Sequence, residues 1–292
     1  MRGRPFRGTE KFSTSRPRLF VSNSAFHHLD RSTAILALIT GASSGIGREL
    51  AKLFAADGHD LVLVARRGEE LQKLAEELKK RKPISIHIVP LDLGEPSAPQ
   101  KLFDKLASKQ LAIDVLVNNA GFGLLGKFHE ADLGKMLAMI QLNATALTHL
   151  TGLFLPSMIA RGSGRILNVA STAAFQPGPL MAVYYATKAY VLSFSEAIGE
   201  ELRGTGVTVT SLCPGPTKTE FGETAGMQGT KLFEGPNVLS VERVARDGFR
   251  ACMKGRRLVV PGLLNTLLIG GSRFLPRGLV LKLVRGFQEK RK

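Results

Sequence analysis

Tyr184 and Lys188 form the pair whose residue types and spacing most directly suggest chemistry in this sequence. They are four residues apart in a segment with helical periodicity, so they lie on one face of the predicted helix. A phenol has a pKa of about 10, but an ammonium group beside it favours the phenolate and lowers this pKa toward neutral pH. The pair alone is a weak signal, because similar surface pairs occur by chance on many helices.

Two further groups of polar residues follow predicted strands. Ser171 follows the strand predicted at 165–169, and the segment Asn118–Gly121 follows the strand predicted at 113–117. The carboxyl ends of the strands form the edge where open α/β sheets bind ligands. We therefore expect these groups to meet the Tyr/Lys pair at one site.

A glycine-rich segment, TGASSGIG at residues 40–47, directly follows the first predicted strand and leads into a helical pattern. Glycines at this point allow a tight turn and let the N–H groups at a helix start approach a pyrophosphate. A plain strand-to-helix turn is the alternative interpretation, but the first βα turn is where doubly wound folds bind dinucleotides. We expect the cofactor to be bound here by Gly41, Ser43, Ser44, Gly45, Ile46 and Gly47.

The end of the second predicted strand indicates which dinucleotide is used. An NAD site carries an acidic residue there, whereas this chain has Arg66 and Arg67, which can pair with a 2′-phosphate. We therefore expect NADP(H) to be preferred over NAD(H), the alternative being that both arginines are merely solvated. Asp92 and Leu93 follow the third strand and are candidates for contact with the adenine, although Asp92 fits a turn or cap equally well.

The elements that position these residues alternate between strand and helix patterns, which predicts an α/β fold with a doubly wound parallel sheet of Rossmann type in a single domain. Between the first two strands, apolar residues recur at helical spacing and Gly58 follows as a left-handed cap. Seven strands are expected, at residues 34–39, 61–65, 84–89, 113–117, 165–169, 207–212 and 258–260.

Taken in order, these motifs resemble those of the short-chain dehydrogenase/reductase family, over residues 34–262. The resemblance rests on TGASSGIG, on NNAG at residues 118–121, and on Asn143, Ser171, Tyr184 with Lys188, and Pro214-Gly215. It implies a Rossmann-type NAD(P) oxidoreductase. It also implies cofactor contacts from Asn119, Ala120, Gly121, Tyr184, Lys188, Pro214, Gly215, Thr217 and Thr219, of which the two threonines alternatively belong to a simple turn.

The same resemblance implies a catalytic role for each of four residues. Tyr184 would exchange the proton with the carbonyl oxygen, and Lys188 would lower the pKa of Tyr184 and hold the nicotinamide ribose. Ser171 would hydrogen-bond the substrate oxygen, and Asn143 would position a water for proton relay. Tyr185 lacks the four-residue spacing to Lys188, so we expect it to pack against the site or line it. The family resemblance also suggests a homo-oligomer.

The net charge of +16 is concentrated at the two ends of the chain. Residues 1–31 hold seven basic and two acidic residues and residues 254–292 hold ten and one, which leaves the body nearly neutral. This distribution argues against a basic groove, so we expect no nucleic-acid partner. We interpret residues 1–33 as a basic, disordered extension of a cytoplasmic protein, with an organelle-targeting peptide as the alternative.

Residues 263–292 form a basic, amphipathic C-terminal arm. Its leucines, valines and phenylalanines alternate with arginines and lysines, a pattern typical of a helix at a membrane surface. The alternative is a helix packed over the substrate cleft or against a dimer partner. No stretch of the chain has the 18 uninterrupted apolar residues of a bilayer span, and the segment 136–160 fits a buried core helix better.

The expected substrate is a small, largely apolar carbonyl or alcohol, such as a lipid, acyl or steroid-like compound. The segment 221–237 holds Phe221, Met227, Leu232 and Phe233, and Phe175, Leu180 and Met181 follow the catalytic serine. We thus expect an NADP(H)-dependent oxidoreductase that interconverts carbonyl and alcohol, the alternative being a non-catalytic dinucleotide-binding regulator. Two cysteines and no Cys/His cluster predict neither disulfides nor a bound metal and favour a reducing compartment.

Overall fold

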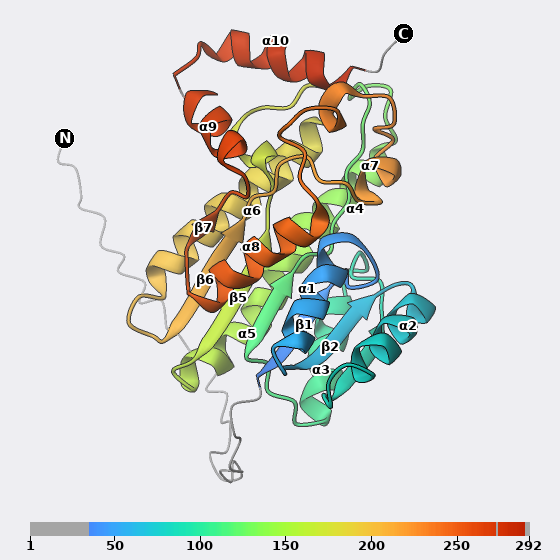
Figure 1. The fold of residues 1–292 in the computed structure, drawn as a ribbon, viewed down its shortest axis with the longest axis vertical. Helices are drawn as coiled ribbons and strands as arrows, with labels where there is room; N and C mark the ends of the chain where they lie inside the picture. The colour runs from blue at the N-terminus through green and yellow to red at the C-terminus, as the bar shows by residue number, and fades with distance from the viewer. Residues whose placement is uncertain (1–34, 273, 290–292) are drawn as a thin grey trace, which may run out of the picture. The chain divides into compact units, whose positions relative to one another are not determined.

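The computed structural model describes residues 35–272 and 274–289, so the expected N-terminal extension at 1–33 lies outside the described residues. The described chain forms a seven-stranded, all-parallel sheet with the order β3-β2-β1-β4-β5-β6-β7 (Figure 1). The order reverses between β1 and β4, as in doubly wound folds. The strands are β1 (Leu36–Thr40), β2 (Asp60–Ala65), β3 (Ile86–Pro90), β4 (Val115–Asn118), β5 (Gly164–Val169), β6 (Val207–Leu212) and β7 (Leu258–Val259).

This architecture confirms the predicted fold class. Every strand boundary lies within two residues of the boundary predicted from the sequence. The third strand begins at Ile86 rather than Ile84, because the Ile84 amide donates to the Lys82 carbonyl at 2.9 Å and so belongs to the preceding turn. Gly58 has φ +85°, the left-handed conformation expected at the end of the first helix.

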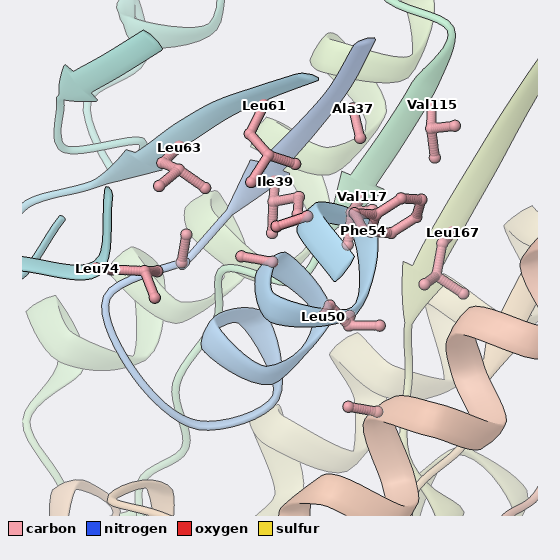
Figure 2. Close-up of a cluster of buried hydrophobic side chains, with 14 of the residues drawn as sticks. Ala37, Ile39, Leu50, Phe54, Leu61, Leu63, Leu74, Val115, Val117 and Leu167 are labelled. Carbon is pink, nitrogen blue, oxygen red and sulfur yellow. The ribbon is translucent and has the colours of Figure 1, made fainter. Parts of the chain in front are cut away.

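Helices cover both faces of the sheet, because side chains of a strand alternate between the faces. Ala37 and Ile39 of β1 face α1 (Gly45–Ala56), α2 (Gly68–Lys79) and α8 (Val241–Met253). Figure 2 shows Leu50 and Phe54 of α1 pointing toward this face. The residues between them, such as Leu38, face α3 (Ala98–Ser108), α5 (Leu147–Ala160) and α6 (Ala182–Glu201).

The segment expected to be a core helix at 136–160 consists of three consecutive helical pieces. It comprises α4 (Leu133–Ile140), a π-helical turn (Gln141–Ala146) and α5. Leu150, Phe154 and Met158 of α5 are buried against the sheet. Among the residues that the structure describes, no helix is both long enough and apolar enough to cross a membrane.

The two cysteines are free and buried in different parts of the described chain. Cys252 lies on α8, in the cluster beneath the sheet, and Cys213 follows β6 and packs against Val191 of α6. Burial raises the thiol pKa of Cys213 to about 11 and that of Cys252 to about 12, so both thiols are protonated at neutral pH.

The C-terminal arm folds into α9 (Leu263–Ser272) and α10 (Arg277–Gln288), after the short helix α7 (Phe221–Thr224) and the 3-10 turn η3 (Lys231–Phe233). One row of α10, formed by Val280, Val284 and Gln288, is buried. Val280 and Val284 belong to the cluster that contains both tyrosines expected at the site. The inner face of α10 therefore packs on the domain, as one of the two interpretations predicted.

Candidate active site

A cavity of about 680 Å³ runs along the carboxyl ends of the strands. Its walls include the glycine-rich loop after β1, the residues after β4 and β5, and the Tyr184/Lys188 face of α6. All the cofactor-binding residues expected from the sequence line it except Gly47. The topology thus collects side chains from distant parts of the sequence at the edge where ligands of open sheets bind.

The glycine-rich loop depends on a close approach between two strands. Gly41 has φ +66°, and a Cβ there would lie 2.7 Å from Asn119 Nδ2. At Gly47 a Cβ would lie 2.4 Å from the Gly41 carbonyl oxygen, so Gly47 lets α1 pack on the loop and does not face the cavity. The prediction that Gly47 contacts the cofactor is therefore not supported by its position, although its role in the loop is explained.

The start of α1 is suited to bind an anion. Ser44, the N-cap residue, makes no side-chain cap hydrogen bond in the described structure, and Ser44, Gly45 and Ile46 line the cavity. The N–H groups of a first helical turn have no partner within the helix and carry the positive end of its dipole. A pyrophosphate would meet both requirements, so the residues present fit a dinucleotide.

Asn119 ties the loop to the end of β4. Its Nδ2 donates to the carbonyl oxygens of Thr40 at 2.9 Å and Gly41 at 3.2 Å. The Thr40 hydroxyl accepts from the amides of Asn119 and Ala120 at 2.9 and 3.0 Å. These bonds fix Asn119, Ala120 and Gly121 at the cavity wall, opposite the start of α1.

Arg66 and Arg67 both line the cavity but have different partners. Arg67 donates to the Ser43 hydroxyl at 3.3 Å and to Glu220 at 2.9 Å. The side chain of Arg66 is 75% exposed and lies 3.9 Å from Asp92. The guanidinium of Arg66 therefore makes weaker contacts than that of Arg67. Arg67 links the second strand to the glycine-rich loop.

Asp92 stabilises a turn and also faces the cavity. Its Oδ1 accepts from the Gly94 amide at 2.9 Å, which stabilises the turn after β3. It also lines the cavity together with Leu93, at the wall that holds Arg66.

Tyr184, Lys188 and Ser171 share one wall of the cavity. The Lys188 ammonium lies 5.8 Å from the centre of the Tyr184 ring and donates to the Val169 carbonyl at 2.8 Å. Both side chains are buried, with 6% of Lys188 and 9% of Tyr184 exposed. The extended backbone at Ser171 directs its hydroxyl to the Ala173 amide, from which it accepts at 3.1 Å.

Burial dominates the acid-base properties of this wall. It raises the pKa of Tyr184 above its ordinary value, although the hydrogen bond with Ser171 acts in the opposite direction. It lowers the pKa of Lys188 to about 8, because the charged ammonium is removed from water. The net shift of the Tyr184 pKa is thus opposite to the lowering expected from Lys188, and the phenol keeps its proton at neutral pH.

Asn143 lies behind the cavity wall and does not line it. It is on the π-helical turn, where its Oδ1 accepts from the Phe122 amide at 3.1 Å and its Nδ2 donates to the Phe122 carbonyl at 2.9 Å. Its Nδ2 also donates to the Thr187 hydroxyl at 3.2 Å, which in turn donates to the Tyr184 carbonyl at 2.8 Å. Asn143 therefore connects the chain after β4 to the helix that carries Tyr184 and Lys188.

The segment after β6 closes another side of the cavity. Pro214, Gly215, Thr217 and Thr219 all line it, and the Thr217 hydroxyl donates to the Gly215 carbonyl at 2.9 Å. A Cβ on Gly215 would lie 2.5 Å from Asn265 of α9. Asn265 is buried and was not among the residues expected at the site, because a single asparagine in an apolar segment gives little sequence signal.

The substrate end of the cavity is mainly apolar. Met181 and the four apolar residues expected in the segment 221–237 line it. Phe175 does not, since it packs with Cys213 and Val191, and Leu180 points away to a smaller pocket beside Met136. Side chains of α9, α10 and their connection complete the wall. The repeat of apolar residues at i, i+4 and i+8 in α10 is the signal that could have identified that helix as a wall.

The fold and the site define a dinucleotide-binding oxidoreductase of the α/β class. Residues 36–229 match the short chain dehydrogenase family, so the chain belongs to that family. Its members include the Sulfoacetaldehyde reductase 2 of Chromohalobacter salexigens, which is 39% identical over 216 residues, covering 72% of this chain and 85% of that one. The chain is an NAD(P)-dependent oxidoreductase of the short-chain type.

Two solved structures extend the comparison. A short-chain dehydrogenase from Sphingobium yanoikuyae in complex with NADPH superimposes with a TM-score of 0.74 at 33% identity, over 84% of this chain and 95% of that one. The bulky-bulky ketone specific alcohol dehydrogenase of Comamonas testosteroni superimposes with a TM-score of 0.69 at 29% identity, over 83% and 95%.

Proposed function

We propose that the protein is an NADP(H)-dependent carbonyl reductase or alcohol dehydrogenase that acts on a largely apolar small molecule. The observation that carries this proposal is the position of Ser171, Tyr184 and Lys188 on one wall of the cavity that the start of α1 also faces. A dinucleotide at α1 and a carbonyl at Tyr184 would then lie in a single cavity.

The cofactor is NADP(H) in preference to NAD(H). Arg66 and Arg67 line the cavity after β2, where a ribose 2′-phosphate would lie, and a guanidinium can pair with it in bidentate geometry. The NADPH complex of the Sphingobium relative supports this preference. When bound, the cofactor supplies the hydride.

Lys188 would hold the nicotinamide ribose, and the residues lining the cavity from Asn119 to Gly121 and from Pro214 to Thr219 would surround the remainder of the cofactor. Asp92 and Leu93 would contact the adenine. Gly41, Ser43, Ser44, Gly45 and Ile46 would hold the phosphates.

The residues of this chain supply the proton. Reduction adds a hydride to the carbonyl carbon and a proton to the oxygen. Tyr184 can supply this proton, because a phenol is protonated at neutral pH and burial raises the pKa of Tyr184 further. Ser171 hydrogen-bonds the carbonyl oxygen and so orients it toward the phenol. The Lys188 ammonium stabilises the phenolate left behind. Asn143 lies behind the cavity wall with its amide bonded to Phe122 and Thr187, so it would hold the helix that carries Tyr184 in position rather than bind the relay water that the family resemblance implies.

The apolar substrate is inferred from the cavity wall. Met181, Phe221, Met227, Leu232 and Phe233 line the end near Tyr184. The relatives differ in this respect, since one is named for sulfoacetaldehyde and another for bulky ketones. The wall supports the second type, because most of a bound ligand's surface is buried against such side chains.

We assign residues 34–262 to the catalytic domain and residues 263–292 to the C-terminal arm. The arm forms part of the cavity wall through α10, and its exposed apolar side chains contact a membrane surface peripherally. The basic and apolar composition of the arm supports this contact.

Turnover of a carbonyl panel tests the proposal. The panel contains aliphatic aldehydes, bulky aromatic ketones and sulfoacetaldehyde, each with NADPH and with NADH. We expect oxidation of NADPH with the apolar compounds, and Tyr184→Phe is expected to lower the rate at least about a hundredfold while NADPH binding is retained. NADPH binding without turnover of any compound would instead favour the non-catalytic regulator, and near-normal activity of Tyr184→Phe would contradict the catalytic assignment.

A further inference from the structure

The C-terminal arm exposes an unusual amount of apolar surface. Of the seventeen large hydrophobic side chains that are exposed in the described structure, ten lie between Leu263 and Phe287. We call these ten side chains, which lie on α9, on α10 and on the segment that connects them, the outer face of α9 and α10. Figure 1 shows both helices, in red, at the end of the domain where α7 also lies. Large exposed apolar patches of this kind mark interaction sites.

The two faces of α10 show that the outer face is not simply a poorly buried core. Val280, Val284 and Gln288 are buried, whereas the adjacent row, Leu279, Leu283 and Phe287, is 44%, 47% and 53% exposed. Both rows repeat every four residues and so form neighbouring stripes on the helix. A helix that needed only to pack on the domain would require just the first stripe. Within the second stripe, Leu283 and Phe287 also line the cavity, whereas Leu279 belongs neither to the buried cluster nor to the cavity wall.

The charges around the outer face indicate which partner covers it. Arg277, Lys282 and Arg285 are exposed on α10. The segment 254–289 contains a single acidic residue, Glu289, which accepts a hydrogen bond from Arg285 at 2.9 Å. A second copy of the chain on this face would bring like charges together. An anionic lipid surface complements them, because its headgroups meet the basic side chains and its acyl boundary accepts the leucines.

The outer face also contains the mouth of the cavity. Leu268, Leu275, Leu283 and Phe287 line the cavity, yet they are 55%, 42%, 47% and 53% exposed. Side chains that contact both the cavity and the solvent must stand at its rim. The inner neighbours of this rim, Val280 and Val284, pack in the same cluster as Tyr184, so the rim lies toward the catalytic wall.

We propose that α9 and α10 dock on an anionic membrane and that the protein takes its substrate, a lipid aldehyde or ketone dissolved in the bilayer, through the mouth in this face. The inference rests on the proposed function, since it names the substrate class and the source of the substrate for the same site. A substrate that enters here passes from the acyl region to the apolar wall beside Tyr184 without crossing water.

Docking is tested by sedimentation of the full chain with vesicles, which requires no turnover. The probes are phosphatidylcholine vesicles with and without phosphatidylglycerol, at low and high salt. We expect binding only to the anionic vesicles, weakened by salt. The variant Leu267→Gln/Phe274→Gln/Leu279→Gln changes outer-face residues that do not line the cavity and is expected to weaken binding at least about tenfold.

The matched control is Phe128→Gln/Ile159→Gln, which removes exposed apolar side chains elsewhere on the domain. It should bind vesicles like the unmodified protein. If the unmodified protein stays in the supernatant with anionic vesicles at low salt, the proposal is wrong. It is also wrong if the triple variant changes the mass of the particle in light scattering, because a second copy would then cover the face.

Uptake from the bilayer is tested with two carbonyl probes, hexadecanal in anionic vesicles and soluble butanal. The triple variant should reduce butanal as the unmodified protein does and lose most of its rate with vesicle-borne hexadecanal. Equal rates of the two proteins with hexadecanal overturn the uptake route while leaving the proposed function intact. Failure of both proteins with both probes, in a chain that still binds vesicles, counts against the proposed function and the uptake route together.

Discussion

At the scale of single residues, the most informative feature is the opposite displacement of two pKa values on one cavity wall. Burial raises the pKa of Tyr184 and lowers that of Lys188 to about 8. At neutral pH the phenol is therefore protonated and the amine is largely charged. This is the state required of an acid that donates to a carbonyl oxygen and of a cation that stabilises the resulting phenolate.

The lowered pKa of Lys188 predicts how the rate of reduction depends on pH. As the pH rises through about 8, the ammonium loses its proton and no longer stabilises the phenolate, so kcat/KM for carbonyl reduction should fall. Measurement of kcat/KM from about pH 6 to 10 tests this decrease. The variant Lys188→Arg keeps its charge throughout this pH range, so its kcat/KM should not fall in this way, whatever its absolute rate. A flat profile of the unmodified protein to the alkaline end would show that Lys188 does not act as an ammonium.

The two arginines after β2 make separable predictions about the cofactor. Arg66→Ala removes the weakly engaged guanidinium and should reduce the ratio of kcat/KM for NADPH to that for NADH by about tenfold or more, since a hydrogen bond to a charged group contributes about 1.5–3 kcal/mol. Arg67→Ala also breaks the links to Ser43 and Glu220 and should weaken the binding of both cofactors. Equal efficiency of the unmodified protein with NADPH and NADH would contradict the assignment.

At the scale of elements, the sequence predicted those parts of the fold that depend on patterns among residues close together in the chain. The loop at 40–47, the seven strands and the Tyr184/Lys188 helix each carry a short-range pattern of glycine, apolar alternation or helical spacing. The packing of α10 could not be predicted in this way. Its apolar residues fit a membrane surface and a protein surface equally well, and the positions of η3 and α6 decide that Val280 and Val284 are buried in the cluster that contains Tyr185.

Three single residues also have positions that depend on parts of the chain distant in sequence. Gly47 has the residue type of a phosphate loop, but the approach of Gly41 places it against the loop backbone. Phe175 is close to Ser171 in sequence, yet the chain turns it toward α6. Asn265 is remote from every motif, and it approaches Gly215 only because α9 follows β7 at the edge of the sheet.

A buried hydrogen bond joins α10 to α6, and its contribution to stability can be measured. Gln288 is fully buried and its Nε2 donates to the Tyr185 hydroxyl at 2.5 Å. Tyr185→Phe or Gln288→Leu alone leaves a buried polar group without its partner, at a cost of about 1–3 kcal/mol, whereas the double variant removes both groups. We therefore expect a coupling energy of about 1 kcal/mol from urea unfolding of the four proteins.

The control for this cycle is Tyr190→Phe, which removes an exposed hydrogen bond to Thr148. It should change the free energy of unfolding by no more than about 0.5 kcal/mol. Strictly additive effects of the two α10 variants would mean that the bond does not hold the helix.

At the scale of the whole molecule, the cofactor should stabilise the fold, because the cavity is assembled from six strand ends and α1. A ligand that binds only the folded state at a hundredfold excess over its Kd adds about 2.7 kcal/mol. NADPH should thus raise the Tm by several degrees and NADH, at the same concentration, by less. Differential scanning fluorimetry measures both shifts without turnover. An equal shift with the two cofactors would contradict the selectivity expected from Arg66.

The alkylation rates of the two buried thiols can report how often different parts of the protein open. Cys252 lies under the sheet and Cys213 beside Lys188, and neither can be alkylated while it stays packed and protonated. Alkylation at Cys252 would then proceed only through global unfolding, whereas alkylation at Cys213 would also follow local opening of the catalytic wall. Comparison of the alkylation rates of the two cysteines with and without NADPH would distinguish local opening of the site from global unfolding of the domain.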